Sequence, residues 1–292
     1  VGALTDFGPM LKNLRLVFFG AAAQLGIFTV LILASLMGFS DKEAASLAII
    51  GGADGPTAIY TSIILAPHLL GPIAIAAYSY MALVPVIIPL VVKFTISKKE
   101  LLINMKKQDE ANSDNDEIKN IGTIKIIFPI VMAIVVSLIV PSSTPLIGFL
   151  MFGNLIKEIG STTIRLSKAI SDNILNSSTV FLGLCIGATM TPDSFLNIQT
   201  LGIIIGGLFA FVISIFGGVV AVKIVNLFVK KKINPLIGAT GLSAVPMASR
   251  VANEIALKND PNNHIMHYAM ASNISGVIGS AVAAGILITF FG

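Results

Sequence analysis

One carboxylate stands alone in an apolar part of the chain. Asp54 lies in the run Ile49-Ile50-Gly51-Gly52-Ala53-Asp54-Gly55-Pro56-Thr57-Ala58, and between Ala44 and Pro67 it is the only ionisable side chain other than tyrosine. A carboxylate at membrane depth costs about 2.5–3.5 kcal/mol on insertion scales, so such a residue is retained for a function. The glycines and proline beside it interrupt a helix. A carboxylate next to the freed carbonyls of a broken helix can bind a small hard cation.

A second interrupted segment offers neutral oxygens in place of a carboxylate. It extends from Asn234 to Glu254 and has no acidic side chain before its last residue. Asn234, Thr240 and Ser243 each supply an oxygen that can bind a cation. Pro246, if it is helical, removes the hydrogen-bond partner of a carbonyl one turn before it. This segment therefore predicts a second place where a helix is broken.

The same segment continues into a charged stripe. Ser243, Met247, Arg250 and Glu254 fall at positions i, i+4, i+7 and i+11, which lie on one side of a helix. We expect this stripe to run from the broken centre to a charged end. Arg250 and Glu254 also have the spacing of an ion pair on a helix surface, and the sequence leaves that interpretation equally open.

A few polar side chains lie deep in other apolar runs. Tyr78 and Tyr80 are many residues from a charged flank, although membrane tyrosines usually lie at the interface with water. A buried phenol needs a partner, and it can bind a cation or pass a proton. Function and anchoring are equally open for Tyr80, and function is less favoured for Tyr78. Asn273 and Ser275 predict either hydrogen bonds between helices or a role in a site.

The composition indicates the class of protein. Of the 292 residues, 55% are hydrophobic and 12% are charged, whereas about 25% are charged in a soluble domain. The 26 glycines suit close packing of helices in lipid. Apolar runs recur along the chain, several of them long enough to cross a bilayer: 16–38, 57–92, 124–140, 200–228 and 264–291. We therefore expect an all-α, polytopic bundle of membrane helices with discontinuous helices.

Charge and motifs exclude several other classes. The net charge of +4 comes mostly from loop lysines, which indicates membrane topology rather than nucleic-acid binding. The single cysteine excludes an internal disulfide and a thiolate metal cluster. The sequence contains no Walker loop, no HExxH and no serine elbow. A soluble enzyme is therefore not indicated.

The chain repeats itself around the two interrupted segments. The stretch Gly52-Ala53-Asp54-Gly55-Pro56-Thr57-Ala58 aligns with Gly238-Ala239-Thr240-Gly241-Leu242-Ser243-Ala244. Broken segments at corresponding places in two halves predict a site near the middle of the membrane. The predicted organisation is repeat 1 over 1–95 with a broken helix at 51–57, a polar loop over 96–122, connecting membrane helices over 123–178, and repeat 2 over 179–292 with a broken helix at 234–246.

The repeat leaves some alternatives open. Chance similarity between glycine- and alanine-rich stretches is one of them. Lysines after residue 92 and after residue 222 both favour the cytoplasmic side, which would make the repeats parallel. Analogy with transporters favours inverted repeats. The charged stretch 97–120 is either a solvated loop or a docking surface.

The broken segments closely resemble those of a known family, the β subunits of the sodium-pumping biotin-dependent decarboxylases of the oxaloacetate, methylmalonyl-CoA and glutaconyl-CoA types. The likeness covers nearly the whole chain. Where that family suggests Gly-Pro-Asn, this chain has Ala271-Ser272-Asn273. The resemblance also implies helices before Val1, so we expect an N-terminal part to be missing. The stretches that carry the likeness are Gly51 to Thr57, Ala76 to Pro85, Asn234 to Gly238, Ser243 to Val251, Gly2 to Pro9 and Gly276 to Gly285.

The resemblance implies an activity and a set of partners. A carboxyltransferase subunit moves a carboxyl group to biotin on a biotin carrier subunit, and the β subunit then releases CO2 from this carboxybiotin. The release is coupled to Na+ export and consumes a proton from the opposite side. Biotin is not attached to this chain. The complex is oligomeric, includes a small membrane γ or δ subunit, and lies in the bilayer of the inner (cytoplasmic) membrane as a multi-pass protein.

The resemblance also implies roles for particular residues. Asp54 and Asn234, with nearby carbonyls such as that of Gly238, fit a Na+ site, and Tyr80 and Ser243 fit a second ion site or a proton relay. Arg250 would meet the carboxylate of carboxybiotin, and Arg250, Tyr80 and Ser243 would serve decarboxylation. A stand-alone Na+-coupled secondary transporter is the alternative. A purely structural scaffold does not account for Asp54.

Overall fold

The computed structural model describes residues 2–110, 120–189 and 198–292. Over these ranges the chain is helical and contains no strand. The α-helices are α1 (Gly8–Lys12), α2 (Val17–Ala22), α3 (Leu25–Leu36), α4 (Asp41–Ala48), α5 (Gly55–Leu65), α6 (Leu70–Thr95), α7 (Lys98–Leu101), α8 (Met105–Glu110), α9 (Ile121–Ile139), α10 (Thr144–Glu158), α11 (Ile164–Lys168), α12 (Leu175–Thr189), α14 (Ile198–Phe228), α15 (Met247–Asn259) and α16 (Met266–Phe291). Shorter helical turns are η1 (Gly2–Leu4), η2 (Leu14–Leu16), η3 (Ile49–Gly52), η4 (Pro67–Leu69), η5 (Pro141–Ser143), η6 (Ser161–Thr163), η7 (Ala169–Ile174) and η8 (Pro235–Thr240).

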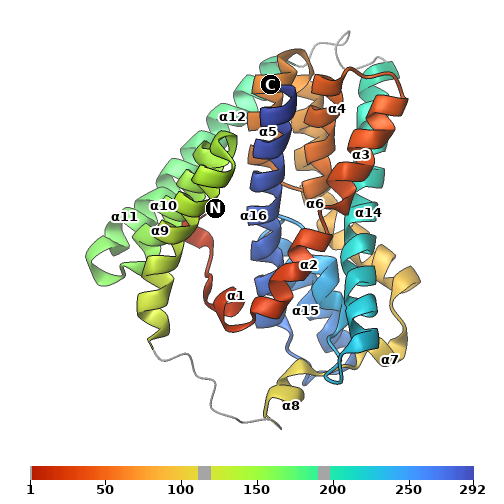
Figure 1. The fold of residues 1–292 in the computed structure, drawn as a ribbon, viewed down its shortest axis with the longest axis vertical. Coiled ribbons are helices and arrows are strands. Elements are labelled where there is room, and N and C mark those ends of the chain that lie inside the picture. The colour runs from red at the N-terminus through yellow and green to blue at the C-terminus, as the bar shows by residue number, and fades with distance from the viewer. Residues whose placement is uncertain (1, 111–119, 190–197) are drawn as a thin grey trace.

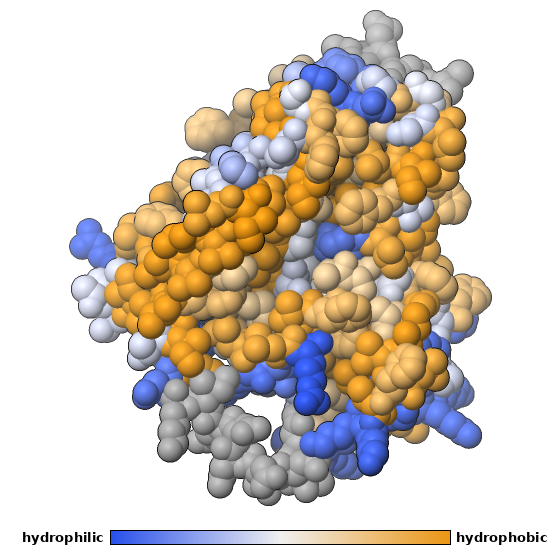
Figure 2. Space-filling model, in the orientation of Figure 1, coloured by the Kyte–Doolittle hydropathy of each residue, from blue (hydrophilic) through white to orange (hydrophobic). Residues whose placement is uncertain are grey.

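Six helical spans in the described residues are long and apolar enough to cross a bilayer. Apolar side chains cover most of the visible surface between the two polar ends (Figure 2). The predicted all-α, polytopic membrane fold is confirmed. Each span except Ser161–Ala188 corresponds to one of the apolar runs recognised in the sequence. The spans are Leu14–Leu36, Pro67–Thr95, Ile121–Ile139, Ser161–Ala188, Thr200–Phe228 and Met266–Phe291.

Two long helices, α14 and α16, organise the centre of the bundle. α14 packs against α3, α6 and η8, while α16 packs against α2, α5 and α15. α9, α10, α11 and α12 lie together on one flank (Figure 1), where α10 contacts α16 and α12 contacts α6. α14 and α16 thus bring the first and the second broken segments into one region, although those segments are far apart in the sequence.

The second broken segment packs against these two helices through close main-chain contacts at glycines. A β-carbon on Gly218 of α14 would overlap the carbonyl of Gly238 in η8, and one on Gly238 would overlap the carbonyl of Gly218. A β-carbon on Gly276 of α16 would overlap the carbonyl of Gly241. Small residues let helices in lipid approach closely, as they do here.

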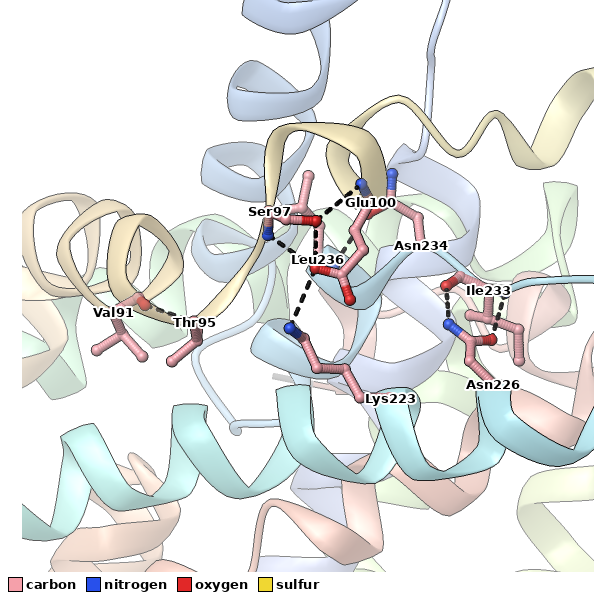
Figure 3. Close-up of polar contacts among 9 residues, drawn as sticks. All are labelled: Val91, Thr95, Ser97, Glu100, Lys223, Asn226, Ile233, Asn234 and Leu236. Carbon is pink, nitrogen blue, oxygen red and sulfur yellow. Dashed lines mark hydrogen bonds and ion pairs between the residues drawn. The ribbon is translucent and has the colours of Figure 1, made fainter.

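One end of the bundle carries a short helix that is tied to α14. α7 begins with a capping box in which Glu100 accepts hydrogen bonds from the amide and the hydroxyl of Ser97 at 2.7 and 2.8 Å. Lys223 of α14 lies 3.1 Å from the Glu100 carboxylate (Figure 3). Burial alone would raise the pKa of Glu100, but Ser97 and Lys223 outweigh it and hold this pKa below 4.5.

Glu100→Gln should lower the free energy of unfolding near neutral pH and have little effect in acid. The pKa of Glu100 is lower in the folded protein than in the unfolded chain, so the ion pair stabilises above about pH 4.5 and its contribution is lost as pH falls further. Glutamine keeps the cap on Ser97 and removes the charge. We expect a loss of about 1 kcal/mol or less at pH 7, because the pair is partly exposed. Thermal unfolding at pH 3–7 checks this, with the exposed Lys99→Gln as control. A loss that does not change with pH would contradict the role of the charge.

Candidate functional site

The first break places a carboxylate at the start of a helix. Ala53 is left-handed (φ 55°, ψ 39°) and Asp54 is extended (φ −121°, ψ 94°). α5 then begins at Gly55, and the Asp54 carboxylate accepts the amide hydrogen of Thr57 at 3.1 Å. A carboxylate at this place caps free amides and meets the positive end of the helix dipole. The cap thus holds the carboxylate in place, and it supplies a hydrogen bond to a residue that is only 9% exposed.

Two serines connect this carboxylate to the second break. The Ser280 hydroxyl of α16 lies 2.8 Å from the second Asp54 carboxylate oxygen, and the Ser243 hydroxyl lies 2.7 Å from Ser280. Ser280 has one hydrogen, which it can give to Asp54 or to the carbonyl of Val277 at 3.0 Å. When Ser280 donates to Asp54, Ser243 donates to Ser280. Hydroxyl oxygens from two elements therefore surround a single negative charge.

The backbones of the two breaks also touch. The Ser243 amide donates to the Gly52 carbonyl at 3.0 Å, and the Ser214 hydroxyl of α14 donates to the Gly51 carbonyl at 2.6 Å. Both carbonyls lie where the helical pattern stops, and each keeps a lone pair after accepting one hydrogen. The predicted meeting of a carboxylate-bearing break with a break that carries neutral oxygens is seen for Asp54 and Ser243.

The second break differs from the predicted helical stripe. Residues 241–246 are not helical, and α15 begins only at Met247. The expectation that Ser243 and Arg250 share one side of a helix is therefore wrong. Proline fixes its own backbone angle and restricts the residue before it, so Pro246 precedes the helix rather than lying within it.

A side chain of α16 satisfies the backbone of the second break. The Leu242 carbonyl accepts a hydrogen bond from the Asn273 amide. The Asn273 oxygen in turn accepts from the Ser249 hydroxyl of α15 at 3.2 Å. Asn273 thus makes hydrogen bonds between elements, as one of its two interpretations predicts, and it holds the break, α15 and α16 together.

Asn234 has a different set of partners from Asp54. Its side-chain amide donates to the carbonyls of Leu101 and Ile103 at 3.1 and 2.9 Å, and its oxygen accepts from the Leu236 amide at 3.0 Å. Figure 3 shows it beside the short helix that carries Ser97 and Glu100. Within the described ranges no contact joins Asn234 to Asp54, and its binding of Na+ stays a prediction.

The chain on either side of Asn234 is equally fixed. Asn226 at the end of α14 pairs with both backbone groups of Ile233, its amide and its oxygen each at 2.7 Å (Figure 3). Gly238 then follows in η8 against α14. The predicted metal-binding role of Gly238 also stays a prediction.

The two tyrosines occupy different places. The Tyr80 hydroxyl donates to the Ile204 carbonyl of α14, and its ring lies 2.6 Å from where Gly207 would carry a β-carbon. Tyr78, favoured less by the sequence, lies 3.0 Å from the corresponding point on Gly55. The structure thus puts Tyr78 beside the Asp54 break and Tyr80 between α6 and α14.

Arg250 is exposed on the first turn of α15. In the part of the chain that the structure describes, its guanidinium has no ion pair and no hydrogen bond, and Glu254 does not pair with it. The alternative of a surface ion pair is therefore not seen. A free guanidinium can take a carboxylate through two parallel hydrogen bonds.

Sequence reasoning did not find two residues at Asp54. Thr57 follows directly from the cap, since the residue three places after a capping side chain supplies the amide. Ser280 lies in the glycine- and alanine-rich stretch that carries part of the family resemblance, where a small residue suggests packing. The available signal was a hydroxyl side chain among glycines and alanines in a long apolar helix, and only the structure shows that it faces Asp54.

Comparison with known proteins identifies the family. The model of the family described as "Na+-transporting oxaloacetate decarboxylase beta subunit" matches residues 1–291. Oxaloacetate decarboxylase beta chain 2 of Salmonella typhi is 47% identical over 99% of this chain and 66% of its own length. Methylmalonyl-CoA decarboxylase subunit beta is 48% identical in Propionigenium modestum and in Veillonella parvula, over 72% and 74% of their lengths. The chain thus spans slightly less than two thirds of that Salmonella relative, and it belongs to the family of Na+-transporting oxaloacetate decarboxylase β subunits.

Proposed function

We propose that this chain is part of the membrane subunit of a decarboxylase sodium pump. It releases CO2 from carboxybiotin that a carrier subunit presents, exports Na+, and consumes a proton. The relatives carry two different acids in their names, oxaloacetate and methylmalonyl-CoA. Either acid hands the same carboxybiotin to a β subunit, so one membrane site serves both.

The meeting of the two breaks carries the proposal. Asp54 brings one negative charge. Ser280, Ser243 and the Gly51 and Gly52 carbonyls bring neutral oxygens to the same region, where hydrogen bonds join the two breaks and α16. Small hard cations prefer such oxygens, and unwound carbonyls bind Na+ in transporters built from broken helices. One carboxylate neutralises one Na+, so the ion can be held without excess charge.

Carboxybiotin would be handled at the basic end of the bundle. α7 and α8 carry Lys98, Lys99, Lys106 and Lys107 and lie at one end of the molecule (Figure 1). Lysine-rich ends face the cytoplasm. α15 packs against α7, so Arg250 lies on an element that joins the second break to this end. Its free guanidinium would bind the carboxylate of carboxybiotin.

The proton enters through the chemistry of the carbamate. Carboxybiotin loses CO2 more easily when the departing nitrogen is protonated: the carbon–nitrogen bond breaks, its electron pair stays on nitrogen, and nitrogen takes the proton. Na+ that arrives at Asp54 displaces a proton from the carboxylate, and the Ser280 and Ser243 hydroxyls offer it a first path. Binding of one ion at a time then couples the two fluxes.

Reconstituted vesicles test the proposed function. The purified complex in liposomes should take up radiolabelled Na+ when oxaloacetate, methylmalonyl-CoA, glutaconyl-CoA or malonate is supplied, and avidin should block uptake by binding biotin. A stand-alone secondary transporter would instead take up Na+ down a gradient of a co-transported solute, without biotin. Na+ uptake that needs no decarboxylation and ignores avidin would overturn the proposal.

Na+ and H+ should compete at this site. A single carboxylate cannot hold both cations, so acid should raise the Na+ concentration that gives half-maximal decarboxylation. Between about pH 8 and pH 5 we expect a rise of about tenfold or more, with the full rate restored at saturating Na+. Decarboxylation measured against Na+ at each pH checks this. A half-maximal concentration that does not change would place the proton path elsewhere, with Tyr80 the next candidate.

A further inference from the structure

A buried carboxamide lies beside the two breaks and has no part in the site described so far. Gln24 occupies the turn between α2 and α3, and it is the only carboxamide residue in the apolar run 16–38. It is 6% exposed. A polar side chain this deep in a membrane span requires partners.

Hydrogen bonds fix the orientation of this carboxamide. Its nitrogen donates to the Gly20 carbonyl at 3.0 Å and to the Gly276 carbonyl at 3.3 Å. These two bonds use both amide hydrogens. The reversed orientation would set the oxygen against two carbonyl oxygens, so the network identifies which end of the group is oxygen.

The oxygen end has no donor. The Gln24 Oε1 atom is fully enclosed, and no hydrogen-bond donor reaches it among the residues that the structure describes. Buried polar atoms are normally paired, and each exception needs a physical explanation. A fixed, buried acceptor that faces no N–H or O–H group is suited to a cation.

The free oxygen lies at the Asp54 break. A β-carbon built on Gly52 would stand 3.7 Å from Gln24 Oε1 and 3.1 Å from the β-carbon of Ser280. Ser280 is the residue that donates to the Asp54 carboxylate. A β-carbon on Gly279 would stand 3.1 Å from the Gln24 nitrogen. The glycines at 52 and 279 therefore leave room for the carboxamide beside the carboxylate and its serine partner.

We propose that the Gln24 side-chain oxygen is a further ligand of the Na+ carried at Asp54, an inference that rests on the proposed function. An amide oxygen is a hard, neutral ligand, so it adds coordination without adding charge. The ligands then come from four parts of the chain: the turn of the first span, the first break, the second break, and α16. Gln24 increases affinity for the ion and takes no part in the release of CO2.

Two substitutions separate a ligand from a structural amide. Gln24→Leu removes the oxygen and the two donated hydrogen bonds. Gln24→Glu keeps an oxygen ligand, replaces the amide nitrogen by oxygen beside the Gly20 and Gly276 carbonyls, and adds an acidic group. Binding of radiolabelled Na+ to the purified complex, and the Na+ concentration for half-maximal decarboxylation, are measured for both. Thr29→Val is the control, because Thr29 lies on the same span and, among the described residues, its hydroxyl bonds only to the Leu25 carbonyl.

Gln24→Leu should bind Na+ at least tenfold more weakly, with a maximal rate at saturating Na+ within about twofold of the wild type. Gln24→Glu still offers an oxygen to the ion and brings a negative charge, so its Na+ binding should be no more than about threefold weaker than in the wild type. A structural role predicts the opposite pattern, in which both variants lose maximal rate and glutamate is no better than leucine. Wild-type Na+ affinity in Gln24→Leu would overturn the proposal. If that variant does not assemble, a tenfold loss in Gln24→Glu overturns it.

Asp54→Asn distinguishes this proposal from the proposed function. If Asp54→Asn loses Na+ binding while Gln24→Leu keeps it, the Asp54 site stands and the Gln24 proposal fails. If Asp54→Asn binds Na+ as the wild type does, the Asp54 site itself fails, and Gln24 fails with it. Loss of affinity in both variants supports both.

Discussion

Vesicles that contain the Asp54→Asn complex should show Na+ uptake at background level and no Na+-dependent decarboxylation. The carboxylate is the only charged group among the contacts described at the two breaks. A unit charge pair at 4 Å contributes about 4 kcal/mol at an effective dielectric constant of 20, which corresponds to about a thousandfold in affinity. Asparagine keeps the shape and can still accept the Thr57 amide, so the protein should remain folded and inserted. Uptake of radiolabelled Na+ measures the effect.

The control for Asp54→Asn is the same chemical change on an exposed acid. Asp41 lies in the first turn of α4 and is exposed. Asp41→Asn should therefore leave uptake within about twofold of the wild type. Uptake near the normal level in Asp54→Asn would remove Asp54 from the ion path, whatever the control shows.

Arg250→Ala should reduce turnover of carboxybiotin by about 100-fold while Na+ binding changes little. A charge-assisted, two-pronged contact with a carboxylate contributes about 1.5–3 kcal/mol, and each 1.36 kcal/mol is a factor of ten. Ser243 and Arg250 do not share one side of a helix, so removing the guanidinium leaves the Asp54 contacts in place. Decarboxylation of free carboxybiotin is compared with Na+ affinity in the same preparation.

Two further variants sharpen the Arg250 experiment. Arg250→Lys keeps the charge and loses the planar pair of donors, so it should recover only part of the rate. Lys258→Ala removes an exposed cation from the same helix and should have no effect. Loss of Na+ affinity with intact turnover in Arg250→Ala would contradict the carboxylate-binding role.

Local chemistry made the breaks predictable. Gly51, Gly52, Gly55 and Pro56 surround Asp54, and no regular helix tolerates that run, so the sequence indicates both the break and the lone acid in it. The membrane class follows from apolar runs that span a bilayer. The repeat of the two halves stays a prediction.

Partners from distant parts of the chain were not predictable. Asn234 is an oxygen donor in the sequence, but its actual partners are the Leu101 and Ile103 carbonyls, more than a hundred residues away. In the sequence Gln24 is one carboxamide in an apolar run. The role proposed for it depends on its position beside Gly52 and Ser280, which only the structure shows. Residue types reveal which groups can act, and only the packing shows which of them meet.

The contacts between glycines have a thermodynamic consequence. Where Gly218 meets Gly238, and where Gly241 meets Gly276, main chain lies directly on main chain. Glycine has no rotamers to immobilise, so these crossings form without loss of side-chain entropy. Lipid offers no hydrophobic drive for helix association, and dispersion with weak Cα–H···O contacts must supply the attraction. The second break is thus attached to α14 and α16 by forces that depend steeply on distance, and a methyl group on Gly218, Gly238 or Gly276 would overlap the main chain across these crossings.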